Sequence, residues 1–434
     1  MTDKSVFSPR ILRPEDANQN WQWDRALASP GFKQVDFETR VDFQRLRKYR
    51  LSRAKNALKN SGLGALILFD VNNIRYITGT KIGEWERDKL CRFALLAGDE
   101  EPFVWDFGSA AVHHQLNCDW LDPSRCLAGM TGMRGTVPPS VGLMKSHAEE
   151  IMSYLKHAGV ADMPIGLDIA ETAMFFELQN AGMNIVDGQQ VMLDAREIKN
   201  IDEITLLNQA ATMVDGVYHM IYEELKPGVR ENDIVALSNQ MLYEMGSDDV
   251  EAINAISGER CSPHPHNFTD RMFRPGDQAF FDILQSYQGY RTCYYRTFNV
   301  GTATSEQNDA YIQCREWLDK AIELIKPGVS TDVVAKAWPK AEEFGFDSEM
   351  QAFGLQFGHG LGLALHERPI ISRLVSLENP MEIKTGMVFA LETYCPAKDG
   401  VSAARIEEEV VVTDKGCKVI SLFPADELPI ANRY

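Results

Sequence analysis

Hydrophobic and polar positions alternate between helical and strand periods through the first half of the chain. The amphipathic stretch RVDFQRLRKYRLSRAKNALKN predicts a helix that starts near residue 41 and ends at Ser61-Gly62. A second alternation runs from SHAEEIMSYLKHAG through MPIGLDI to NIVD. Short apolar runs predict strands at 65–69, 92–98 and 101–107. Helices that alternate with short buried strands indicate an α/β domain ending near residue 195.

Residues 1–40 show no such period and are predicted to form an N-terminal arm. Trp21 and Trp23 lie there among Pro, Asn and Asp residues. Two large aromatic side chains in a segment without a core period of its own favour packing against another surface. We therefore expect a homodimer in which the arm of one subunit covers the pocket of its partner.

The second half repeats one helix-ending pattern. EELKPGVREND at 223–233 is matched by ELIKPGVSTDV at 323–333, an offset of one hundred residues. In both copies a helix ends at Lys, Pro stops it, Gly turns the chain and polar residues open the next helix. The pattern indicates an internally duplicated domain, with chance use of common helix breakers as the alternative.

Composition and charge narrow the class of protein. The 434 residues suggest two or three domains, and 44% hydrophobic with 24% charged residues is ordinary for a globular protein. The net charge of −18 repels phosphate backbones, so we expect no nucleic-acid partner. No run approaches the ~18 apolar residues of a membrane span, so we expect no membrane partner. Eight dispersed cysteines without a CxxC pair, and an N-terminus without an apolar core, favour the cytoplasm.

The most specific stretch for chemistry is FGHGLGLALHE, residues 357–367. Its three glycines beside His359 allow the backbone to approach a ligand closely, and His366 follows seven residues later. A lone buried histidine is usually a packing residue. Two histidines in this glycine frame favour a functional site.

Acidic residues also interrupt apolar strands in this half. Asp282 lies within AFFDILQ, Glu392 within MVFALETY, and Glu407 opens ARIEEEVVVT. A buried carboxylate requires a partner or a metal ion. Asp282, His359, Glu392 and Glu407 therefore form a candidate oxygen-and-imidazole cluster, the ligand set that suits Mn, Fe, Co or Zn.

These motifs resemble the signature of the creatinase, prolidase and aminopeptidase P family, which has the pita-bread fold. The resemblance covers roughly residues 45–425 and includes the KPG duplication. Its other elements are FGHGLGLALHE, the PGD before Asp282, RTF at 296–298, ExxxP from Glu392, RIE at 405–407 and the junction REIKNIDEI. It implies an α/β creatinase-type N-terminal domain at 41–195 and an α+β pita-bread catalytic domain with internal pseudo-twofold duplication at 196–434.

Within that family the N-terminal half is most similar to the dimethylsulfoniopropionate lyase branch. The matching features are YR at 49–50, LFDVNNIRYITG, Trp85, the RFALL run and Trp105-Asp106.

The resemblance also implies roles for individual residues. Asp282 would be the first aspartate ligand of the metal, His359 the histidine ligand, Glu392 the first glutamate ligand and Glu407 the bridging one. His366 would hydrogen-bond the substrate or an intermediate.

A further catalytic histidine is expected about eleven residues before Gly276. Pro265 stands at that spacing between His264 and His266, and both histidines remain candidates.

One position departs from the family pattern. Metal-binding members carry GYxSDxTRTF, whose aspartate bridges two ions, whereas this chain reads GYRTCYYRTF with Cys293 at the bridging position. A neutral thiol is a poor donor to hard divalent ions, although a thiolate can bind a softer ion such as zinc. The three expected outcomes are a single weakly bound ion, a thiolate-assisted pair or no ion, so fewer than two ions is the main expectation.

The leading interpretation is a creatinase-like hydrolase or lyase of a small cationic or zwitterionic, osmolyte-like molecule. His366 and either His264 or His266 would transfer protons, and Glu392 or Glu407 would orient them or raise the basicity of a water. The candidates for substrate binding are Tyr290, Tyr294, Tyr295 and Arg405, with aromatic strand packing as the alternative for the tyrosines.

Two other functions stay open. A metal-dependent Xaa-Pro dipeptidase is favoured by the intact FGHGLGLALHE motif and opposed by Cys293. A catalytically silent binding module is opposed by the retained Asp, His and two Glu residues, for which a silent domain has no physical need.

Overall fold

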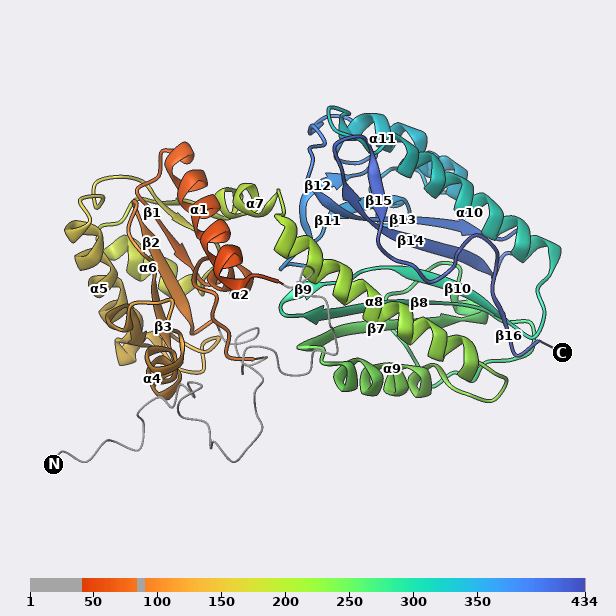
Figure 1. Cartoon of the computed structure of the whole chain (residues 1–434), viewed down its shortest axis with the longest axis horizontal. Coiled ribbons are helices and arrows are strands. Elements are labelled where there is room, and N and C mark those ends of the chain that lie inside the picture. Colours follow the sequence, from red (N-terminus) through yellow and green to blue (C-terminus); the bar gives the residue numbers. More distant parts are fainter. Residues whose placement is uncertain (1–40, 84–89, 434) are drawn as a thin grey trace, which may run out of the picture. The chain divides into compact units, whose positions relative to one another are not determined.

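The computed structural model describes residues 41–83 and 90–433, which fall into two compact units that meet in sequence at 195/196 (Figure 1). Trp21 and Trp23 of the arm, and Trp85, lie outside the described residues. The dimer contact expected of the arm therefore stays a prediction. No helix in the described ranges is both long and apolar enough to cross a bilayer.

The first unit is an α/β domain built on a six-stranded mixed sheet of order β4-β3-β2-β1-β5-β6. Central β1 pairs antiparallel with β2 and parallel with β5. The strands are β1 (Ala65–Leu68), β2 (Phe93–Ala97), β3 (Phe103–Asp106), β4 (Cys126–Ala128), β5 (Ile165–Leu167) and β6 (Ile185–Asp187). The helices are α1 (Phe43–Ser61), α2 (Val71–Thr78), α4 (Gly108–Asn117), α5 (Leu143–His157), α6 (Thr172–Asn180) and α7 (Gln189–Arg196).

The helix and the three strands predicted for this unit are confirmed. Asp42 caps α1 by accepting hydrogen bonds from two backbone N–H groups, and Gly62 ends it with φ of 74°. Trp105 on β3 stacks on Phe93 of β2, with ring centroids 4.6 Å apart, inside the core of the sheet.

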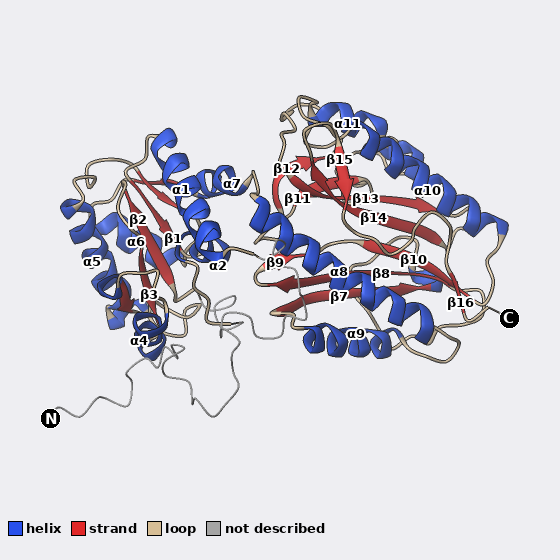
Figure 2. Ribbon diagram, in the orientation of Figure 1, coloured by secondary structure: helices blue, strands red, loops and turns tan. Residues whose placement is uncertain are grey.

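The second unit contains two five-stranded sheets, each covered by helices (Figures 1 and 2). The first sheet has the order β16-β10-β8-β7, with β9 paired to β8, and the second has the order β12-β11-β13-β14-β15. The first comprises β7 (Asp249–Ser257), β8 (Gln278–Tyr287), β9 (Tyr290–Arg291), β10 (Tyr295–Val300) and β16 (Ile430–Ala431). The second comprises β11 (Phe357–Gly360), β12 (Glu367–Ile371), β13 (Val388–Pro396), β14 (Ala403–Val412) and β15 (Cys417–Val419). The main helices are α8 (Ile201–Glu224), α9 (Glu231–Met245), α10 (Ser305–Leu324) and α11 (Thr331–Ala337).

The duplication predicted from the KPG motifs is confirmed in the hydrogen bonds of the backbone. Gly228 donates its N–H to the carbonyl of Phe273, and Gly328 donates to Ile383 in the same way. A further pair of bonds, from Val229 and from Val329 to the lysine carbonyl three residues earlier, repeats as well. The two halves therefore use one turn to connect a long helix to the next helix and to the sheet.

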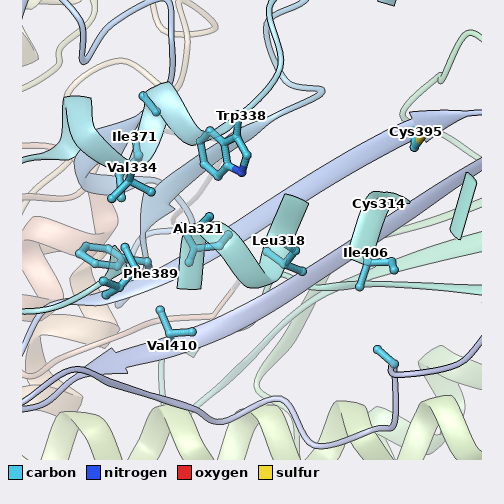
Figure 3. Close-up of a cluster of buried hydrophobic side chains, with 14 of the residues drawn as sticks. Cys314, Leu318, Ala321, Val334, Trp338, Ile371, Phe389, Cys395, Ile406 and Val410 are labelled. Atoms are coloured by element: carbon cyan, nitrogen blue, oxygen red, sulfur yellow. The ribbon is translucent and has the colours of Figure 1, made fainter. Parts of the chain in front are cut away.

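Strand alternation places apolar side chains on one face of the second sheet and the candidate catalytic and ligand side chains on the other. One face of β13 and β14 packs against α10 and α11 in a core that includes Leu318, Trp338, Phe389 and Ile406 (Figure 3). The other face carries Glu392 directly opposite Glu407. The helices thus fix these strands from behind and leave their opposite face for chemistry.

The glycines of the FGHGLGLALHE motif serve the packing of the chain itself. A methyl group on Gly358 would lie 2.6 Å from the Leu391 side chain, one on Gly360 would overlap the Arg368 carbonyl, and one on Gly362 would lie 2.6 Å from a Glu367 carboxylate oxygen. The packing of the chain itself therefore requires these glycines, and a close approach of a ligand to this backbone stays a prediction. Their missing side chains let β11 lie close to its neighbouring segments.

Glu367 fastens this motif to the junction segment that opens the second unit. Its buried carboxylate lies 3.2 Å from Arg196 Nε and 2.8 Å from Lys199 Nζ, and it accepts the N–H of Ala364. Burial alone would raise the pKa of Glu367, but Lys199 and Arg196 hold it below its ordinary value. The junction REIKNIDEI is thus part of the support for the loop that carries His366.

Glu367→Gln is expected to destabilise the second unit by about 3–5 kcal/mol at neutral pH, because it removes the buried charge that Lys199 and Arg196 share. Hydrogen exchange of the β11–β14 amides in urea measures the change. Because the folded-state pKa is lowered, the stabilisation by Glu367 is present above pH 4.5 and is lost as the pH falls through that lowered pKa, so the difference should narrow there. Exposed Glu378→Gln is the matched control, and an equal effect of both changes would refute the role.

Candidate metal and catalytic site

Five strands of the second unit direct polar side chains to one buried cluster. The cross-strand registers place Asp282 on β8 opposite Tyr295 on β10, and Glu392 on β13 opposite both Glu407 on β14 and Phe357 on β11. His359 follows Phe357 by two residues and therefore projects from the same face of β11.

His359 is prepared to act as a metal ligand. Its ring is fully buried, and Nδ1 lies 3.0 Å from the Gly360 carbonyl oxygen, a contact that places the proton on Nδ1. Nε2 is buried and has no hydrogen-bond partner among the described residues. Burial, aided by His366, lowers the pKa of His359 to about 3, so the imidazole is neutral and Nε2 carries a free electron pair.

The side chains of Glu407 and Cys293 lie close to a ring nitrogen of His359 in one buried group. Both carboxylate oxygens of Glu407 are buried without a hydrogen-bond partner among the described residues. Burial, with Glu392 and Asp282 nearby, raises the pKa of Glu407 well above its usual value. Burial and the neighbouring carboxylates also raise the pKa of the Cys293 thiol. One donor atom each from Cys293, His359 and Glu407 lies within 4.8 Å of the other two.

Asp282 and Glu392 fall outside that three-residue group and have partners of their own. Asp282 accepts a hydrogen bond from Asn254 Nδ2 at 3.1 Å, and the Cys293 Sγ lies 3.9 Å from its other oxygen. Glu392 forms a buried ion pair with Arg405 Nη2. Burial raises the pKa of both carboxyl groups, and Arg405 opposes that shift.

Arg405 brings a guanidinium into the predicted ligand set. Nη2 also donates to the Gly354 carbonyl at 2.7 Å, and the guanidinium lies over the Tyr295 ring, 4.5 Å from its centroid. Its Nε and Nη1 groups are buried without hydrogen-bond partners among the described residues. Arg405 therefore supplies a positive charge and two unused donors inside the cluster.

The residues fit one divalent ion better than two. Three unpaired or weakly paired donors, from Cys293, His359 and Glu407, converge as the ligands of a single ion do. Asp282 and Glu392, also predicted as ligands, lie outside this three-residue group, and Glu392 is paired with Arg405. A bound ion at the three-residue group would supply Lewis-acid chemistry.

The predicted catalytic histidines contact the cluster at two separate places, beside His359 and beside Tyr295. His366 is exposed, and its ring centroid lies 4.5 Å from that of His359. His264 is half-buried, 5.7 Å from the Tyr295 ring, and its Nε2 has no hydrogen-bond partner in the described part of the chain. His266 is exposed and stacks on His264 at 4.3 Å. Their catalytic roles stay predictions.

The tyrosines predicted to bind substrate divide into two kinds. Tyr295 lies at the cluster beside Arg405, as expected of a wall residue. Tyr294 directly precedes β10, packs in the core with Tyr218 and donates its hydroxyl to Asp215 at 2.5 Å. Tyr290 donates to Glu203 at 2.8 Å and is fully buried. Tyr290 and Tyr294 are therefore buried side chains whose hydroxyl groups bond carboxylates, which agrees with the packing alternative for these tyrosines.

Sequence reasoning missed two residues of the cluster. Glu409 accepts the Cys293 backbone N–H at 2.8 Å, and Asn254 bonds Asp282. The period-2 pattern of RIEEE was sufficient to place Glu409 on the face of Glu407. Asn254 has no comparable signal, since a polar residue within VEAINAIS is read as an ordinary strand position.

Comparisons with known proteins agree with this architecture. Residues 205–414 match the model of metallopeptidase family M24, and residues 50–198 match that of the creatinase/prolidase N-terminal domain. A Xaa-Pro dipeptidase of Pyrococcus furiosus is 30% identical over 276 residues, which are 62% of this chain and 76% of that protein. The chain belongs to metallopeptidase family M24.

Members of the family with different activities are similar to this chain. Dimethylsulfoniopropionate lyase DddP of Roseovarius nubinhibens is 24% identical over 398 residues, covering 89% of this chain and 87% of the lyase. The crystal structure of dipeptidase PepE from Mycobacterium ulcerans has the same fold, with a TM-score of 0.70, 23% identity, and coverage of 91% of this chain and 99% of that one. The relatives of this chain therefore include both peptidases and a lyase. Membership of family M24 alone does not decide which of the two activities this chain has.

We expect Glu407→Gln and His359→Gln each to abolish a rise in melting temperature that Zn²⁺ or Co²⁺ produces in the native protein. A ligand at about 100 times its Kd stabilises a folded protein by about 2.7 kcal/mol, which differential scanning fluorimetry detects readily. Metal-free Glu407→Gln should melt no earlier than the native protein, because a neutral amide is less costly to bury than an unpaired carboxylate.

Glu378→Gln and His157→Gln, the same changes at exposed positions, should keep the full metal-dependent rise. A rise that survives in both cluster variants would place the metal elsewhere.

Proposed function

We propose that this M24 member is a non-peptidase hydrolase or lyase that acts on a small zwitterionic or cationic, osmolyte-like molecule. The observation that carries the proposal is the ion pair between Arg405 and Glu392, next to a cysteine in place of the bridging aspartate. Together they take two predicted carboxylate ligands out of a dinuclear site. The water activation that a peptidase of this family derives from two ions is then unsupported.

The charges of the cluster favour a zwitterion. Asp282, Glu392 and Glu407 are buried around one guanidinium, so acidic groups outnumber basic ones, and a bound cation would favour their ionised forms. Such a place attracts a cationic group. The free Nε and Nη1 donors of Arg405 offer a partner to a carboxylate at the other end of the same molecule. Tyr295, whose ring lies under Arg405, would form part of the wall.

Proton transfer would come from the histidines at the border of the cluster. His366 is exposed beside His359, which fits exchange of protons with solvent and substrate. His264 presents an unpartnered Nε2 from the side of Tyr295. Desolvation by the surrounding protein lowers the pKa of His264, His266 and His366, so each is mainly a neutral base at pH 7.

A Xaa-Pro dipeptidase is the second candidate. It is supported by the convergence of Cys293, His359 and Glu407 and by the peptidases among the relatives. A silent binding module is disfavoured, because the unpaired buried atoms of His359 and Glu407 cost stability without a ligand to bind.

Location and assembly complete the proposal. All eight cysteines are free and seven of them are buried, which suits a reducing compartment, and we propose the cytoplasm. We propose the homodimer on the sequence evidence of Trp21 and Trp23 alone.

The test is a substrate screen of the purified protein against Xaa-Pro dipeptides, creatine-like ureas, and sulfonium and ammonium zwitterions, with and without added Zn²⁺. We expect turnover of one of the zwitterions or ureas and none of the dipeptides. Within the active class, a compound with the carboxylate replaced by an ester should show a higher KM, because it cannot engage Arg405. Cleavage of Xaa-Pro dipeptides as the main activity would overturn the proposal.

With the substrate identified, His366→Gln is expected to lower kcat by about 10²–10⁴, the usual contribution of a positioned acid or base. His157→Gln, the same change at an exposed helix end, should leave kcat within twofold. Unchanged turnover in His366→Gln would leave His264 and His266 as the remaining candidates.

A further inference from the structure

We propose that Cys293 is a thiolate ligand of a single borderline-soft divalent ion, held together with His359 Nε2 and Glu407. The proposal concerns the metal alone and holds for either substrate class considered above. It differs from the site expected of the family, in which an aspartate at this position bridges two ions.

The first support is the state of the three donors. His359 Nε2 and both oxygens of Glu407 are buried without partners among the described residues, and the Cys293 Sγ belongs to the same group within 4.8 Å. Buried polar atoms are rarely left unpaired, because each costs free energy. A single bound ion would give all three side chains a partner.

The second support is the way the protein holds Cys293. Its backbone N–H donates to Glu409 Oε1 at 2.8 Å, and Arg296 ties the neighbouring strand to the Glu407 carbonyl and to the Glu408 carboxylate. These bonds join the segment that contains Cys293 to β14, which carries Glu407. They therefore hold the thiol close to the Glu407 carboxylate.

The third support concerns the number of ions. Arg405 forms an ion pair with Glu392 and stacks over Tyr295, so its guanidinium already neutralises a carboxylate that a second ion would need. Asp282 is engaged by Asn254 and is not part of the three-residue group. The donor set is then one sulfur, one nitrogen and one carboxylate. Such a set favours Zn²⁺ or Co²⁺ over Mn²⁺ and Mg²⁺.

Binding requires that the thiol lose its proton. The ion replaces hydrogen on Sγ, the new bond is metal–sulfur, and the proton passes to solvent. No oxidant or reductant takes part.

The test is titration of the full-length, metal-free protein with Co²⁺, followed by absorption spectroscopy and by metal analysis after gel filtration. We expect one Co²⁺ per chain and a thiolate-to-cobalt charge-transfer band in the near ultraviolet. Cys293→Ser should lose that band and bind Co²⁺ at least tenfold more weakly. Cys417→Ser, a change at a cysteine outside the cluster, should keep both the band and the affinity.

Cys293→Asp is the second variant, because it restores the family residue and keeps a ligand at this position. It should bind metal without the charge-transfer band and shift the preference from Co²⁺ toward Mn²⁺ by at least tenfold. A native protein that binds one Co²⁺ without the band, or a band that survives in Cys293→Ser, would overturn the proposal. Two bound ions per native chain would refute the claim that the ion pair of Arg405 with Glu392 prevents a second ion from binding.

Discussion

The burial of several carboxyl groups on facing strand positions is the constraint on which the second unit depends. The strand register brings Glu392 against Glu407 in the second sheet, and Asp282 lies on β8 of the first sheet; all three carboxyl groups are buried. Each charge there must be neutralised, protonated or bound to an ion. Arg405 neutralises Glu392, and Glu407 is left without a partner among the described residues. The chemistry of the site follows from this difference: Glu392 is paired with a cation, and Glu407, directly opposite, is available to bind an ion.

Most of the fold and much of the site were readable from the sequence, for identifiable reasons. The α1 helix and strands β1–β3 carry local signals, an amphipathic period with an αL glycine and short apolar runs. The KPG turns repeat because each makes the same backbone bonds in its half. Asp282, His359, Glu392 and Glu407 stand out because a polar residue within a buried strand is unusual. What the sequence could not supply was which partner each carboxylate has, since Arg405 lies thirteen residues from Glu392 and meets it only through the β13–β14 register.

Contacts with distant segments decide what local patterns leave open. The glycines of FGHGLGLALHE indicate a close approach to the backbone, and in the structure the approaching atoms belong to Leu391, Arg368 and Glu367. The run of tyrosines suggests one aromatic wall, whereas Tyr294 and Tyr295 belong to different core clusters. A local pattern therefore predicts that a contact exists, and the fold decides which residues make it.

The internal duplication relates Cys293 to Arg405, the two residues that change the predicted metal site. Asp282 with Tyr295 in the first half corresponds to Glu392 with Glu407 in the second, since each acidic residue lies opposite its partner in the equivalent hairpin. Cys293 precedes Tyr295 by two residues, and Arg405 precedes Glu407 by two. The pseudo-twofold thus places Cys293 and Arg405 at equivalent positions. An aspartate at 293 would add one more carboxylate to the buried group around Arg405, whereas a thiol that ionises only on binding a metal does not. The cysteine therefore lowers the charge that must be buried when no ion is bound, and this links the single-ion site to the stability of the unit around it.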